Sequence, residues 1–173
     1  MRRLTDKIHL HSRIGCTSAN GPGQRYAIWF QGCTLKCPGC FNPETHGRAE
    51  GLEIAIEELV QDILATPNIQ GLTVSGGEPF QQLPALASLV TSIRARSLLS
   101  ILVFTGFSLK EIANMPGSEP VLKNIDVLIA GRFDSRQRIA RGLRGSSNKQ
   151  VHLFTNRYSH EEIDEVPLSE IFI

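Results

Sequence analysis

The sequence predicts an α/β fold: a partial (β/α) barrel of mostly parallel strands that is open on one side. Strand-like and helix-like segments alternate from about Tyr26 onward, which is the pattern of βα units around a parallel sheet. The chain has 173 residues, whereas a complete eight-fold (β/α) barrel needs about 250. Its composition, 41% hydrophobic and 20% charged, is that of an ordinary globular domain. We therefore expect one domain whose barrel is incomplete.

The first βα unit begins with the apolar run Tyr26–Phe30, which predicts a strand. A helix is expected after it, because apolar residues recur at helical spacing with acidic residues between them. The apolar positions of this helix are Leu52, Ile56, Leu59, Val60, Ile63 and Leu64. Before this unit, His9 and His11 alternate with Ile8 and Leu10 in a short strand-like segment, so we expect both histidines to face solvent.

The next units repeat this order. Leu72–Ser75 predicts a second strand, and an apolar stripe at helical spacing follows it. The stripe consists of Leu83, Leu86, Leu89, Val90 and Ile93. Ile101–Phe104 predicts a third strand, after which Ser108 and Glu111 have the spacing of a capping box and predict a short helix.

Two further strands complete the expected core, at Ile125–Ala130 and Val151–Phe154. No repeat, low-complexity tract or Pro/Ser-rich linker divides the chain, so residues 1–173 are interpreted as a single domain. Within it we expect an N-terminal extension with the loop that leads into the core (1–25), a βα core (26–155) and an acidic tail (156–173).

Charge and hydropathy exclude several classes of protein. The formal net charge is +1, so no charge excess points to nucleic acid or to a membrane surface. No apolar run approaches the roughly 18 residues of a membrane-spanning helix, and the N-terminus lacks the apolar segment of a signal peptide. We expect a protein of the reducing cytoplasm with neither a nucleic-acid nor a membrane partner.

Three of the four cysteines form a C-x3-C-x2-C pattern directly after the first strand: Cys33, Cys37 and Cys40. In a reducing compartment such crowding indicates metal ligation rather than disulfides. Thiolates suit either an iron-sulfur cluster or zinc. A zinc site would need a fourth ligand, for which Cys16 or His46 would have to serve. A cube held by three cysteines would instead leave one iron open to a cofactor.

A second motif, Ser75-Gly76-Gly77-Glu78-Pro79, follows the second strand. Adjacent glycines allow backbone to approach a ligand closely, although a Gly-Gly pair is often only a tight turn. The cysteine loop also follows a strand, and βα sites assemble at the carboxyl ends of parallel strands. The two motifs are therefore expected on the same face.

With both motifs in this order, the sequence resembles the radical S-adenosylmethionine (SAM) superfamily, and most closely the small activating enzymes of anaerobic ribonucleotide reductase. The resemblance runs from about Asn20 onward. Its other landmarks are Asn20–Arg25, Gly32–Asn42 with Thr45, Thr105-Gly106, Asp126–Leu128 with Gly131 and Phe133, and Arg144–Asn148.

The resemblance implies a barrel of the radical SAM type and assigns roles to particular residues. Cys33, Cys37 and Cys40 would hold a [4Fe-4S] cluster, with SAM on its fourth iron. The turn that starts at Ser75 would bind SAM, with Gly76, Gly77 and Glu78 at its methionyl amino end. Phe41 would lie against the adenine; many superfamily members have an aromatic residue just before the third cysteine, where this chain has Gly39.

The implied function is a glycyl-radical activase that acts on a separate protein, class III ribonucleotide reductase, with flavodoxin or ferredoxin as a low-potential electron donor. One alternative is a radical SAM enzyme that acts on another glycyl-radical enzyme, a peptide or a small metabolite. The other is a zinc-binding interaction module without catalysis.

Other conspicuous residues admit two interpretations each. The basic stretch Arg132–Lys149 is either a solvated surface or a docking surface for an acidic partner. Cys16 is either a free thiol or a residue that serves the cluster. Arg25 either anchors a carboxylate or forms an ordinary surface pair.

Overall fold

A computed structural model of the chain describes residues 6–140 and 142–165. The strands are β1 (Lys7–Thr17), β2 (Arg25–Phe30), β3 (Leu52–Ala55), β4 (Gly71–Gly76), β5 (Ser100–Thr105), β6 (Val127–Ala130) and β7 (Gln150–Leu153). The helices are α1 (Ile56–Ala65), α2 (Leu83–Arg96), α3 (Leu109–Ala113), α4 (Glu119–Asn124) and α5 (His160–Asp164), with short 3-10 turns η1 (Pro43–Thr45), η2 (Pro79–Gln82) and η3 (Ser135–Gln137). None of the helices within these residues is both long and apolar enough to cross a bilayer.

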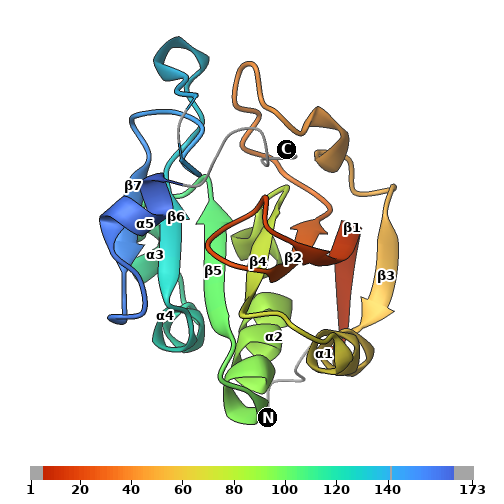
Figure 1. Ribbon diagram of the computed structural model, residues 1–173. Coiled ribbons are helices and arrows are strands. Elements are labelled where there is room, and N and C mark those ends of the chain that lie inside the picture. Colours follow the sequence, from red (N-terminus) through yellow and green to blue (C-terminus); the bar gives the residue numbers. More distant parts are fainter. Residues whose placement is uncertain (1–5, 141, 166–173) are drawn as a thin grey trace.

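The strands form one open sheet in the order β3-β1-β2-β4-β5-β6-β7 (Figure 1). The four central strands β2, β4, β5 and β6 are parallel, as the alternation of strands and helices predicts. Antiparallel strands flank them, with β1 and β3 on one side and β7 on the other. The α/β prediction, with an open rather than a closed barrel, is confirmed.

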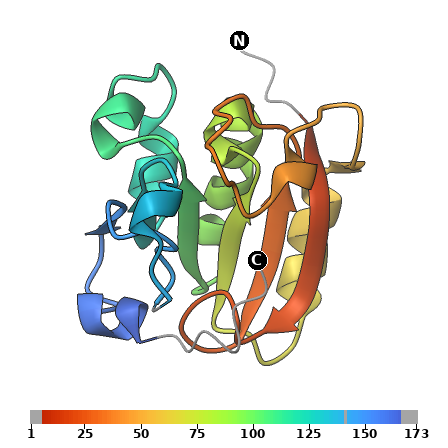
Figure 2. The ribbon, with the colours of Figure 1, turned by 90° about the horizontal axis from the view of Figure 1, so that it is seen from above.

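The two faces of the sheet have different roles because side chains alternate along each strand. Ile28, Val74 and Val103 belong to the main core, which α1 and α2 complete. Figure 2 shows α1 and α2 behind the strands. On β2 and β4 the next residues along, Trp29 and Ser75, line a cavity on the other face. The helices therefore bury one face of the sheet and leave the other for a site.

The edges of the sheet differ from the sequence-based expectation. The strand-like segment around His9 is longer than expected, because it belongs to the 11-residue strand β1. In it Ile8 and Leu10 are buried and His11 is exposed, whereas His9 is half-buried rather than facing solvent. Leu52 was expected in the first helix, but it lies in β3 opposite Leu10, and the helix begins at Ile56. The predicted strand near Val151 exists but runs antiparallel to β6. These pairings depend on distant strands, which periodicity does not report.

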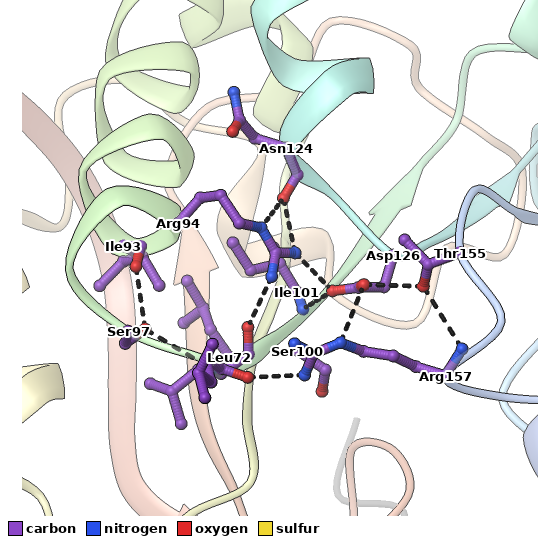
Figure 3. A network of polar contacts seen from close by, with 12 residues as sticks. Leu72, Ile93, Arg94, Ser97, Ser100, Ile101, Asn124, Asp126, Thr155 and Arg157 are labelled. Atoms are coloured by element: carbon purple, nitrogen blue, oxygen red, sulfur yellow. Dashed lines mark hydrogen bonds and ion pairs between the residues drawn. The ribbon is translucent and has the colours of Figure 1, made fainter.

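At the amino-terminal end of the central strands, the buried Asp126 carboxylate is the centre of a polar network (Figure 3). Its Oδ2 accepts hydrogen bonds from Arg94 Nη2 at 2.6 Å and from the backbone N–H of Ile101 at 2.8 Å. Its Oδ1 accepts from Thr155 Oγ1 at 2.8 Å and lies 3.5 Å from Arg157 Nε. The carboxylate thus connects α2, β5 and the segment after β7, and it serves the fold rather than the site.

Candidate functional site

The residues that the sequence singles out line one cavity of about 200 Å³: Cys33, Cys37, Cys40, Phe41, Ser75, Gly76, Gly77 and Glu78. The cavity lies at the carboxyl ends of the parallel strands, and Figure 1 shows the cysteine loop and the segment after β6 at that end of the sheet. A wider depression of about 720 Å³ beside Leu98 and Tyr158 contains none of these residues. The structure therefore brings the two predicted motifs together.

The cysteine loop leaves β2 in a conformation that backbone contacts hold at both ends. Gly32 N–H donates to Thr45 O at 2.7 Å, and Cys33 N–H donates to His46 O at 3.2 Å. Inside the loop, Lys36 and Gly39 have φ values of 50° and 70°, in the left-handed region. These reversals wrap the loop, and all three of its cysteines line the cavity.

The three thiols are free, and each is partly buried. Burial raises the pKa of the Cys33 thiol, and the negative charges of Glu78 and of the two other cysteines raise it further, against a backbone hydrogen bond at Leu35. Three neighbouring thiolates repel one another, so a cationic iron centre would stabilise their ionised form.

The donor set fits a cluster with one open iron. In the described part of the chain, no group of three or more His, Cys, Asp and Glu side chains is arranged to hold one metal ion. A cubane distributes its thiolates over separate iron atoms, so its ligands need not converge on one point. Cys16, a candidate fourth ligand, is exposed and donates to Gln24 Oε1 at 3.3 Å. Neither Cys16 nor His46 is among the described residues that line the cavity.

The Gly-Gly turn packs against the start of the cysteine loop, backbone to backbone. Gly77 N–H donates to Phe30 O at 2.8 Å, and Glu78 N–H donates to Gly32 O at 2.9 Å. Gly76 has a φ of +103°, and a Cβ on it would lie 2.3 Å from the Phe30 nitrogen. A Cβ on Gly77 would lie 2.4 Å from Gly32 O. Both positions must therefore be glycine because the backbone of the cysteine loop and of β2 leaves no space for a Cβ. The sequence motif alone does not reveal this reason.

The Glu78 carboxylate is fully buried and surrounded by protein donors. Oε1 accepts from Phe80 N–H at 3.0 Å and from Thr105 Oγ1 at 2.8 Å, and Oε2 accepts from Gly106 N–H at 2.7 Å. Burial raises the pKa of Glu78, while these hydrogen bonds and the charge of Lys149 act in the opposite direction. Glu78 therefore joins the ends of β4 and β5, and the turn presents mainly backbone groups to a ligand.

Phe41 is held by the segment that follows β6. Its ring centroid lies 4.3 Å from that of Phe133, and the guanidinium of Arg138 lies 4.9 Å from the Phe41 ring centroid. A Cβ on Gly145 would lie 3.0 Å from the Phe41 ring. This segment therefore covers part of the ring, and contact of Phe41 with adenine stays a prediction.

Most of the basic stretch is paired within the chain. Ion pairs join Arg132 to Glu111 at 2.8 Å, Arg136 to Asp134 at 3.0 Å, and Arg144 to Asp164 at 3.1 Å. These contacts reduce the charge available to an acidic partner, and Arg141 lies outside the described residues.

Arg25 differs from both sequence-based interpretations, because it is fully buried and its hydrogen-bond acceptors are hydroxyl and carbonyl oxygens. Its guanidinium donates to Thr73 Oγ1 at 2.7 Å, Leu72 O at 2.9 Å and Ser100 Oγ at 2.9 Å. It starts β2, whereas the site lies where β2 ends.

The sequence did not predict that residues from the segment after β6 also line the cavity. Its lining includes Phe133, Arg138, Leu143 and Lys149. The motif Arg144–Asn148 was a signal that this region matters, but not that it reaches the cysteines.

Comparison with known proteins agrees with this geometry. Residues 19–152 match the family model described as a 4Fe-4S single cluster domain. The chain is 32% identical over 142 residues to the anaerobic ribonucleoside-triphosphate reductase-activating protein of Enterobacteria phage T4, covering 79% of this chain and 88% of the phage protein.

Two other similarities involve longer proteins. The pyruvate formate-lyase-activating enzyme of Staphylococcus epidermidis is 40% identical over 98 residues, which are 53% of this chain and 39% of that enzyme. QueE from Escherichia coli aligns structurally with a TM-score of 0.47 and 16% identity, over 58% of this chain and 52% of QueE.

The family match defines an iron-sulfur protein that uses SAM, which favours a [4Fe-4S] cluster over zinc as the resident metal. The chain belongs to the 4Fe-4S single cluster domain family and, within the radical SAM superfamily, to the activating enzymes.

Proposed function

We propose that this protein cleaves SAM reductively at a [4Fe-4S] cluster held by Cys33, Cys37 and Cys40, and thereby generates a glycyl radical on anaerobic ribonucleoside-triphosphate reductase. The observation that carries the proposal is that Cys33, Cys37 and Cys40 line the same cavity as the Ser75–Glu78 turn. A low-potential cluster bound there would supply the electron that splits the sulfonium of SAM into methionine and a 5'-deoxyadenosyl radical.

The chain's own residues would bind and orient SAM and limit access of water. Carbonyl groups of Gly76 and Gly77 would accept hydrogen bonds from the methionyl amino group, while Glu78 fixes the turn through Thr105 and Gly106. Phe41 and residues of the segment after β6 contact each other and line the same cavity. Such pre-organisation is the protein's contribution when a cofactor performs the redox chemistry.

A separate protein as hydrogen donor follows from the open sheet. The described residues form an open sheet rather than a closed barrel, which leaves a side where a loop of a large substrate can enter. The phage relative is named for anaerobic ribonucleoside-triphosphate reductase, and this chain spans 88% of it. We infer the same partner here, in the reducing cytoplasm, with flavodoxin or ferredoxin as electron donor.

Pyruvate formate-lyase is the second candidate partner, because the activating enzymes named for it are 40% identical to part of this chain. This chain matches only 39% of the length of the Staphylococcus epidermidis enzyme, so most of that enzyme has no counterpart in the match.

Anaerobic electron paramagnetic resonance tests the proposal. Cluster-loaded, reduced protein is mixed with SAM and with each candidate partner from the same organism, and Cys37→Ala serves as the inactive control. We expect a glycyl-radical doublet with the reductase. A doublet only with pyruvate formate-lyase would show that this enzyme, rather than the reductase, is the partner. SAM cleavage without a doublet on either partner, while a known activase produces one, would contradict glycyl-radical activation.

A further inference from the structure

Among the described residues that line the cavity, Lys149 is the cation without a partner. The cavity is lined by three basic side chains: Arg138, Arg144 and Lys149. Arg144 is paired with Asp164, and the guanidinium of Arg138 lies over the Phe41 ring. For the Lys149 ammonium, neither a hydrogen bond nor an ion pair is found with any residue in 6–140 or 142–165. Its positive charge is therefore available to a ligand.

The backbone places Lys149 at the edge of the sheet where the cavity lies. Lys149 N–H donates to Ser146 O at 3.2 Å, and the next residue, Gln150, pairs with Ala130 at the end of β6. A Cβ on Gly131 would lie 3.5 Å from the Lys149 Cα. Lys149 therefore comes from a turn packed against a central strand, so its position is defined by the sheet.

Negatively charged groups of both motifs act on the Lys149 ammonium. Burial lowers the pKa of Lys149, and the negative charges of Cys37, Glu78 and Cys40 act against this shift. Glu78 already accepts three hydrogen bonds from other groups. Lys149 is half-buried, and a partly desolvated cation is stabilised by a counterion. Lys149 thus lines the same cavity as the cysteine loop and the Gly-Gly turn, close enough for the charges of both to act on it.

We infer that Lys149 binds the carboxylate of the methionyl group of SAM, an inference that rests on the proposed function. The methionyl end carries an ammonium and a carboxylate. Backbone carbonyls of the Gly-Gly turn suit the ammonium, and a lysine suits the carboxylate through a charge-assisted hydrogen bond. Lys149 and the turn together would recognise both groups, which distinguishes SAM from derivatives that lack the carboxylate.

Equilibrium dialysis under anaerobic conditions tests this role on the cluster-loaded protein. The dissociation constants of SAM and of decarboxylated SAM are measured for wild type and Lys149→Met. A lost charge-assisted hydrogen bond weakens binding of SAM about 10- to 100-fold. Decarboxylated SAM should bind both proteins within about 2-fold, because it lacks the group that Lys149 contacts. Lys149→Arg should recover part of the affinity, and the exposed Lys123→Met should match wild type.

Iron content, the cluster spectrum and the cluster midpoint potential without SAM are recorded for every variant. Unchanged SAM affinity in a cluster-loaded Lys149→Met protein would overturn the inference, and so would equal weakening of both ligands. A shifted midpoint potential with unchanged SAM affinity would assign Lys149 to the cluster instead. If Lys149→Met fails to load a cluster, Lys149→Gln and Lys149→Arg take its place in the same comparison. Failure of the wild type to bind SAM would refute the proposed function rather than this assignment.

Discussion

A methyl group added at Gly77 should disturb the cysteine loop as well as the SAM turn. The φ of Gly77 lies outside the left-handed region, so alanine fits its backbone conformation and the obstacle is space. The new Cβ would lie 2.4 Å from Gly32 O, 2.9 Å from the Gly32 carbonyl carbon and 3.1 Å from Thr45 O. All three atoms belong to backbone, which cannot rotate away as a side chain can.

The size of the effect follows from these contacts. Overpacking of a well-packed site costs about 1 to 3 kcal/mol. Two backbone hydrogen bonds, Gly77 N–H to Phe30 O and Glu78 N–H to Gly32 O, must lengthen when the strands separate, and each contributes about 1 kcal/mol. We expect Gly77→Ala to lower the free energy of unfolding by about 2 to 5 kcal/mol. Because Gly32 directly precedes Cys33, cluster loading should fall with it.

Gly47→Ala is the matched control, since its Cβ would meet only Glu50 side-chain atoms at 3.5 and 3.7 Å. Urea unfolding of the metal-free chains gives the stability difference, and iron content with visible absorbance after anaerobic reconstitution gives cluster loading. Gly47→Ala should stay within about 0.5 kcal/mol of wild type. A Gly77→Ala protein as stable as wild type and fully loaded with iron would refute the packing argument.

Three further outcomes follow from other parts of the molecule. Alanine at Cys33, Cys37 or Cys40 should abolish the cluster while Cys16→Ala retains it, measured as iron per chain; equal loss in Cys16→Ala would contradict the three-ligand assignment. Asp126→Asn should cost about 3 to 5 kcal/mol in urea unfolding, because it breaks a buried ion pair. Glu119→Gln, in an exposed pair, should cost no more than about 0.5 kcal/mol, and similar losses in both variants would argue against the network. The capping hydrogen bonds at Ser108, with Arg132, lower the pKa of Glu111 to about 2 from the ordinary 4.5, so its contribution is present above pH 4.5 and is lost as pH falls toward 2. The stability difference between wild type and Glu111→Gln should shrink over that range, and a difference independent of pH would show that the carboxylate has no such role.

Much of this protein can be predicted from short stretches of its sequence. The strand Tyr26–Phe30, the capping box at Ser108 and the amphipathic helix from Leu83 depend on neighbours a few residues away, and all three are found. The two site motifs are equally local. Their arrival at one edge of the sheet follows from the rule that parallel strands share the direction of their carboxyl ends.

The remaining features depend on contacts between distant segments. Leu52 joins a strand because Leu10 lies opposite it, and Arg25 is buried because hydroxyl and carbonyl oxygens from β4 and β5 surround its guanidinium. Position 77 must be glycine because Gly32 O lies where a Cβ would be. Lys149 reaches the cavity because β7 pairs antiparallel with β6. A local pattern carries the propensity of a segment and the chemistry of its side chains. The identity of a side chain's neighbours is a property of the folded sheet, since packing and burial override local preference.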